Sequence, residues 1–160
     1  MSRRADALAD RVEQGAQALA VFAESLSDAE WRMNVPKDGR PIGVIVHHVA
    51  SVYPIEVQLA QTIAGGKPVA GVTWDGVAHM NAEHAQKHGA VPKAETLALL
   101  RRNSKAAADA VRTFSDEQLD AAAPVSLNSE APLTSQFIIE DHALRHSYHH
   151  LARIRAAVGR

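Results

Sequence analysis

Histidine is the residue type in this chain best suited to chemistry, because there are nine histidines and no cysteine. Imidazole nitrogens bind divalent transition metals, and any thiol chemistry would need a thiol from outside the chain. The histidines fall into three groups along the sequence: His47 and His48; His79, His84 and His88; and His142, His146, His149 and His150. Spacing and neighbours decide which of them could share an ion.

The last group contains a pair with the spacing of one helical turn. On a helix, His146 and His150 would have Cβ atoms about 5–6 Å apart, so both imidazoles could reach one ion at a Zn–N distance of about 2.0–2.1 Å. Such a pair is more often incidental than a metal site. Here, apolar residues at three- and four-residue steps predict that the pair points inward: Ile139, Ala143, Ile154 and Ala157. The neighbouring row, which includes Ile138, His142 and His149, is more polar and is expected to face solvent or the edge of the bundle.

A third candidate ligand comes from an earlier segment. His48 lies between Ile45 and Val52 on an apolar stripe that is expected to stay buried through Ile55 to Ile63, whereas His47 points about 100° away on a helix. Three inward histidines are costly unless their polar atoms are satisfied. We therefore predict a divalent metal on His48, His146 and His150, a ligand set typical of catalytic zinc with an open position. Zinc or nickel is favoured, and iron is also compatible.

Other interpretations stay open at this point. His84 and His88 also have four-residue spacing, but they lie just before Gly89, where a histidine interacts favourably with a helix C-terminus without any metal. Glu56 and Glu83 fit a solvated helix carboxylate as well as a general base. A metal-free bundle with three hydrogen-bonded core histidines is the plainest alternative.

The elements that must position these residues are helices. Apolar residues recur at three- and four-residue steps, and no sustained alternation predicts a sheet. Pro54 should free the carbonyl near Ala50, and Pro124 to Pro132 is expected to form a polar loop. We predict an all-α four-helix bundle in one domain, residues 1–160, with short extra helices in the connections; the long helices are expected at 3–26, 41–64, 92–114 and about 135–158, and a short one at 74–88.

Composition and charge limit the function classes. The formal net charge is −1 and the basic residues are spread along the chain, so we expect no nucleic-acid partner. No apolar run reaches the roughly 20 residues of a membrane span, and Met1 to Asp10 is charged where a signal peptide would be apolar. We expect a cytoplasmic protein with no membrane partner.

Two segments resemble the DinB/YfiT-like metalloenzyme family, and the likeness covers nearly the full chain. They are Pro-Ile-Gly-Val-Ile-Val-His-His-Val-Ala from Pro41 and His-Ser-Tyr-His-His from His146. The resemblance implies a four-helix bundle and gives the ligand role to His48, His146 and His150. Arg153 departs from the family, since many relatives carry glutamine three residues past the last histidine.

The resemblance also implies an activity. Family members with an assigned reaction resemble S-transferases or isomerases in which a metal activates a low-molecular-weight thiol such as mycothiol, bacillithiol or glutathione. The predicted function is thus a metal-dependent enzyme activating a thiol or water against a small-molecule substrate, working as a homodimer. The alternative is a non-catalytic metal-binding or stress-associated dimeric helical bundle.

Overall fold

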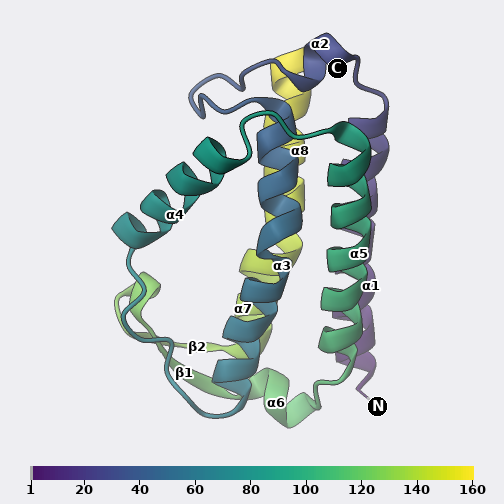
Figure 1. Cartoon of the computed structure of the whole chain (residues 1–160). Coiled ribbons are helices and arrows are strands. Elements are labelled where there is room, and N and C mark those ends of the chain that lie inside the picture. Colours follow the sequence, from purple (N-terminus) through teal and green to yellow (C-terminus); the bar gives the residue numbers. More distant parts are fainter. Residues whose placement is uncertain (1) are drawn as a thin grey trace.

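Four long helical segments form the frame of the protein (Figure 1). The computed structural model describes residues 2–160. The first three segments are α1 (Arg3–Glu24), α3 (Ile42–Ala64) and α5 (Lys93–Arg112). The fourth is continuous but has three parts: α7 (Ser135–Ile138), the π-helical η2 (Ile139–Leu144) and α8 (Arg145–Val158). The predicted four-helix bundle is confirmed.

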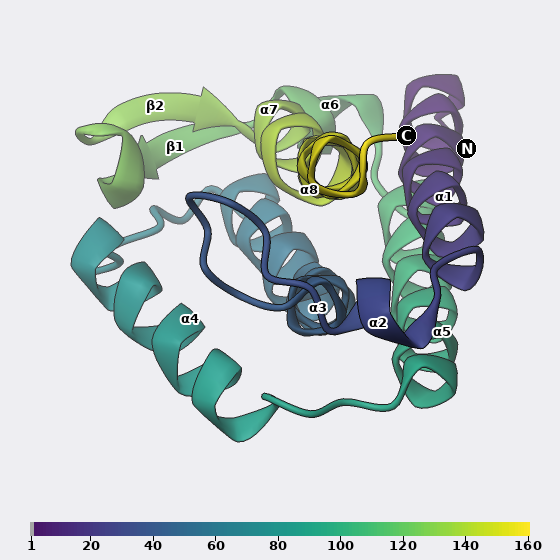
Figure 2. The same ribbon diagram turned by 90° about the horizontal axis from the view of Figure 1, so that it is seen from above.

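The four segments form a closed ring around an apolar core. α1 contacts α5 and α8, and α3 contacts α5 and the α7–η2–α8 segment, as the view along the bundle shows (Figure 2). The core contains side chains that are almost fully buried from all four segments, among them Leu8, Leu19, Ile45, Tyr53, Leu100, Val111 and Ile154. Burial of this apolar surface is the main stabilising contribution to the fold.

Short helices fill the connections, as predicted. α2 (Asp28–Trp31) and α6 (Asp116–Asp120) each begin with a capping box, formed by Ser27 with Glu30 and by Ser115 with Gln118. α4 (Trp74–Lys87) corresponds to the predicted short helix. It contacts α3 but buries none of its residues, and it lies apart from the other helices in both ribbon views (Figures 1 and 2).

A small hairpin corrects the expectation of no sheet. β1 (Ala122–Val125) pairs antiparallel with β2 (Ala131–Thr134), with Pro124 opposite Pro132. Val69 extends the pairing, since its amide donates to the Pro124 carbonyl at 3.0 Å and its carbonyl accepts from Ser126 at 2.9 Å. Strands of four residues are too short to show a clear alternation, and their prolines are typical of edge strands. The expected polar loop is therefore partly strand.

Proline inside α3 has the predicted consequence. Pro54 has no amide hydrogen to donate to the carbonyl of Ala50, four residues earlier. The Asn103 side chain on α5 donates to that carbonyl instead, with Nδ2 and the oxygen 2.8 Å apart. A side chain of the neighbouring helix thus replaces the missing backbone bond.

The buried stripe predicted for α3 is wrong at one position in its second half. Ile55 was expected inside but is 42% exposed, whereas Tyr53 and Glu56 are buried. Apolar residues occur on two neighbouring rows of this helix, and periodicity alone cannot decide which row faces the partner helices. Because of this error, Glu56 was not predicted to be buried.

α3 is also long and apolar enough, by length and composition, to pass as a membrane span, so the expectation that no segment reaches this threshold was too strong. In the folded chain, 67% of its most apolar 18-residue stretch is buried. A helix at the centre of a protein core meets the same criterion.

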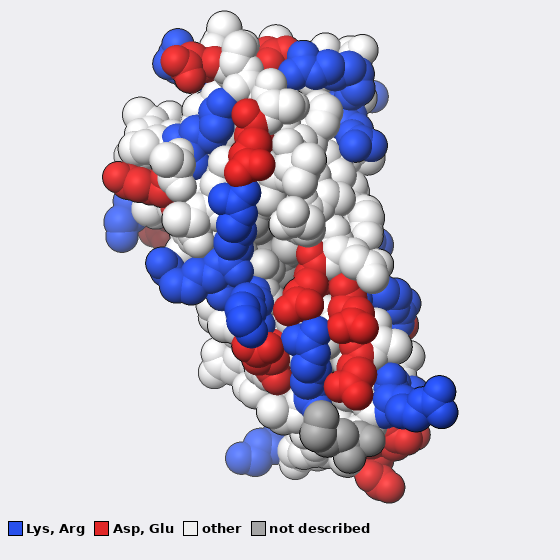
Figure 3. Space-filling model, turned by 90° about the vertical axis from the view of Figure 1, so that its right-hand side faces the viewer, with Lys and Arg blue, Asp and Glu red and all other residues white. Residues whose placement is uncertain are grey.

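The face formed by α1 and α5 carries charges of both signs side by side (Figure 3). Arg112 on α5 pairs with Asp10 and Glu13 on α1 at 2.9 and 3.0 Å, and Arg101 pairs with Glu24 between the same helices. These side chains are partly exposed, and each such pair contributes little, roughly 0–1 kcal/mol. They help to align two helices whose main contact is apolar.

Candidate metal centre

The three predicted ligands meet in the interior of the bundle. Packing of α3 against the last helical segment places His48 Nε2 3.2 Å from His146 Nε2, and His150 Nε2 3.0 Å from the same atom. One nitrogen from each ring lies within 4.8 Å of the others. Ligands on a tetrahedral zinc ion are about 3.4 Å apart, so the rings would need only small shifts to hold an ion.

The π-helical turn explains how the last segment presents this pair. Ile138 was expected on the more polar row, yet Ile138 and Ile139 are both buried. A π turn adds a residue to the helix and rotates the rows that follow it, and such turns are frequent at functional sites. After η2, the buried residues of α8 are Ser147, His150, Leu151 and Ile154; His150 and Ile154 belong to the predicted inward row, whereas Ser147 and Leu151 were not predicted to lie inside.

Glu56 is the residue that sequence reasoning left undecided. Its Oε1 lies 2.8 Å from His146 Nδ1, and its side chain is only 8% exposed. A carboxylate bound to the outer nitrogen of a histidine fixes the tautomer in which Nε2 has a free lone pair. The available signal was spacing: Glu56 follows His48 by two four-residue steps on the same helix.

Hydrogen bonds alone do not satisfy this group. With a proton on Nδ1 facing Glu56, His146 Nε2 has one lone pair, but two other Nε2 atoms approach it. Among the described residues, His150 Nδ1 and Glu56 Oε2 are buried and have no hydrogen-bond partner. Because unpaired buried polar atoms are costly, a cation between the three Nε2 atoms fits the donor set better than protons do.

Burial also keeps the rings in the form that binds metal. It lowers the pKa of His48 to about 3 and that of His150 to about 2, with the charge of a protonated His146 as the next cause in each. Neutral imidazole is the ligand form. Both rings are therefore unprotonated at neutral pH.

An ion pair from the loop before α3 lies close to the same group. Arg40 Nε contacts Asp38 Oδ1 at 2.6 Å, and both side chains are largely buried. The guanidinium of Arg40 contributes to the lowered pKa of His48 and His150, and its Nη1 is buried without a partner among the described residues. Sequence analysis gave no signal for this pair.

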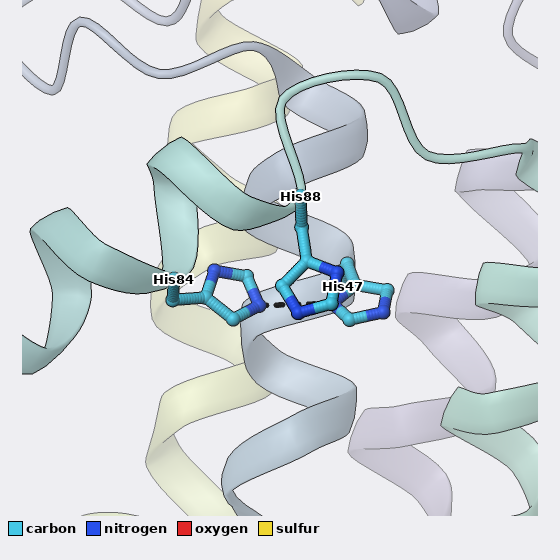
Figure 4. Close-up of side chains that lie close together, drawn as sticks. All are labelled: His47, His84 and His88. Carbon is cyan, nitrogen blue, oxygen red and sulfur yellow. Dashed lines mark hydrogen bonds between the residues drawn. The ribbon is translucent and has the colours of Figure 1, made fainter.

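Histidines outside the predicted set do not all face solvent. His47 Nδ1 lies 2.8 Å from His84 Nε2, and the His47 and His88 rings stack with centroids 4.2 Å apart (Figure 4). His84 and His88 do lie at the end of α4, as expected, but they meet α3 there. His79 and His149 are exposed, and His142 is half-buried beside Asp141.

A surface hollow of about 750 Å³ lies elsewhere. It is lined by α1 residues, including Glu13, Gln17 and Phe22, together with Arg155, and no histidine borders it. Its volume therefore says nothing about chemistry at the histidine group.

Comparison with known proteins places the chain in a family. The model of the DinB superfamily matches residues 11–154. The chain belongs to the DinB superfamily. Among solved structures it is similar to YfiT from Bacillus subtilis, described as a probable metal-dependent hydrolase with an unusual four-helix bundle topology; the TM-score is 0.77 at 18% identity, over 99% of this chain and 89% of that one. This DinB-superfamily chain matches no curated protein.

Proposed function

We propose that this DinB-superfamily protein binds a divalent metal on His48, His146 and His150 and is a metal-dependent enzyme. The observation that carries the proposal is the convergence of three Nε2 atoms. Those of His48 and His150 lie 3.2 and 3.0 Å from that of His146, whose other ring nitrogen, Nδ1, contacts Glu56. Zinc or nickel suits three imidazoles, and iron is compatible.

The residues of the chain have separate roles in this proposal. His48 and His150 are buried and would hold the ion from two helices, while the His146 side chain is 20% exposed and would leave the ion accessible to solvent. Glu56 orients His146 through its Nδ1. A divalent metal at these nitrogens would supply Lewis-acid chemistry, lowering the pKa of a thiol or a water molecule at its open position.

Two nucleophiles fit the site. Water is supported by the likeness to YfiT, which is described as a probable metal-dependent hydrolase. A low-molecular-weight thiol is supported by the resemblance to S-transferases of this family, and the chain has no cysteine that could replace it. In either reaction a small-molecule electrophile is the substrate. The competing proposal is a non-catalytic metal-binding protein.

The test compares His146→Ala with His142→Ala, a histidine of the same helical segment outside the group. Metal per chain is measured in protein purified without a histidine tag, and turnover is measured on a panel of esters and amides and on a panel of electrophiles with added thiols. We expect His146→Ala to lose one metal equivalent, and its turnover to fall by more than the roughly 10–100-fold typical of an outer-sphere change.

Three results decide the proposal. His142→Ala should keep both metal and activity, and both variants should keep the helical content of the parent chain. Full metal occupancy in His146→Ala would overturn the site. Stoichiometric metal without turnover on either panel would favour the non-catalytic protein.

A further inference from the structure

We infer that His47, His84 and His88 form a second divalent-metal site, which fastens α4 to α3. The inference goes beyond the proposed function and does not depend on it, because none of these residues belongs to the first group. Three imidazoles from two helices are a ligand set for zinc, nickel or copper.

The geometry of the three rings fits a shared ion. One nitrogen of each lies within 4.8 Å of the others, and the closest pair is His47 Nδ1 and His84 Nε2 at 2.8 Å. The His88 ring lies 4.2 Å from the His47 ring and 4.7 Å from the His84 ring, centroid to centroid. All three side chains gather at one point between α3 and α4 (Figure 4).

α4 lacks a buried face that would hold it against the bundle. None of its 14 residues is buried, and its large apolar side chains Trp74 and Met80 are 61% and 40% exposed. A helix of this length is marginal in water without a packed face. His84 of α4 and the C-cap residue His88 both contact the His47 ring on α3, so an ion there would replace the missing apolar packing.

The two histidine groups are neighbours but separate. His47 and His48 are adjacent in sequence and point about 100° apart on α3, and the rings of His48 and His84 contact edge to face with centroids 5.7 Å apart. Two dications so close repel each other. We therefore expect the second equivalent to bind more weakly than the first, in a distinct step.

Titration of the metal-free, tag-free protein with Zn²⁺ tests the site. The parent chain should bind two equivalents, and His84→Ala and His88→Ala should each bind one. His79→Ala is the matched control, because His79 is an exposed histidine of the same helix, and it should bind two. His146→Ala should bind one, and that one should be lost when His84→Ala is added.

Hydrogen exchange gives a second readout that does not depend on counting metal. Amides of α4 should exchange more slowly once the second equivalent binds, by about 100-fold at free Zn²⁺ a hundredfold above the Kd. The same protection should appear in His146→Ala and should be absent in His88→Ala. His84→Ala and His88→Ala chains that each bind as many equivalents as the parent chain would overturn the inference, whatever the number that the parent binds.

Discussion

Glu56 shows how much one side chain adds to a histidine cluster. Three imidazoles can gather in a core for packing reasons, but a carboxylate that is itself buried has a solvation cost that needs compensation. Here one oxygen contacts His146 Nδ1 and the other has no partner among the described residues. Such an arrangement is costly in a purely structural cluster and is common behind metal-bound histidines.

The Glu56→Gln variant tests this role. The amide keeps the volume and can still accept a hydrogen bond from His146, but it loses the negative charge that makes the ring a stronger ligand. We expect metal affinity to fall by about 10–100-fold, measured by competition with a chelator of known affinity. Glu83→Gln is the control, since Glu83 is an exposed carboxylate of α4, and equal affinities in the two variants would contradict a role for Glu56.

At the scale of elements, a side-chain hydrogen bond from α5 to α3 replaces a backbone hydrogen bond that is missing within α3. Pro54 leaves the Ala50 carbonyl without its helical donor, and Asn103 supplies one. We expect Asn103→Ala to destabilise the fold by about 1–3 kcal/mol, because the buried carbonyl is left unpaired. Urea unfolding of the metal-free chain measures this change.

A double variant separates the bond from other effects at Asn103. Pro54→Ala restores an amide that can donate to the Ala50 carbonyl, so Asn103→Ala should cost much less in that background. Independent, additive losses in the two single variants would show that the two residues are not coupled, and the proposed replacement of the backbone bond would be wrong.

Elements also show what the sequence could predict. The rows on the last helix placed His146 and His150 inward because apolar residues surround them on both sides. The same method misplaced Ile138 and Ile55, since a π turn changes the register and α3 has apolar residues on two rows. It could not pair His47 with α4, because the position of a helix without a buried face is not encoded in its periodicity.

On the scale of the whole molecule, the fold of the metal-free protein disfavours protonation of its buried histidines. The ring of four helices buries His48 and His150 in a neutral form. Burial that suits metal binding is unfavourable for protonation, so the stability of the fold is linked to pH. Arg40 and His84 add to this effect on His48, whereas the charge of Asp38 opposes it.

The metal-free protein should therefore lose stability as pH falls below the ordinary histidine value. The folded pKa values, about 3 for His48 and about 2 for His150, are lowered from 6.5. As pH drops through about 6.5, the unfolded chain takes up protons that the folded chain excludes, so the free energy of unfolding decreases; each fully excluded proton contributes a slope of about 1.4 kcal/mol per pH unit. The stability is fully present above this pH.

Urea unfolding of the metal-free chain between about pH 7.5 and pH 5 measures this slope, in a window above the range where carboxylates titrate. The His150→Leu variant lacks one of the histidines that exclude a proton in the folded chain, so the slope of its unfolding free energy with pH should be smaller by about 1.4 kcal/mol per pH unit. The His79→Ala variant, changed at an exposed position, should keep the slope of the parent chain. In excess Zn²⁺, the free energy of unfolding should fall more steeply as pH decreases. Neutral imidazole is needed to hold the ion, so the stabilisation by the metal disappears below about pH 6. A stability that is flat from pH 7.5 to 5 in the metal-free chain would contradict the buried, neutral histidines on which the proposed centre depends.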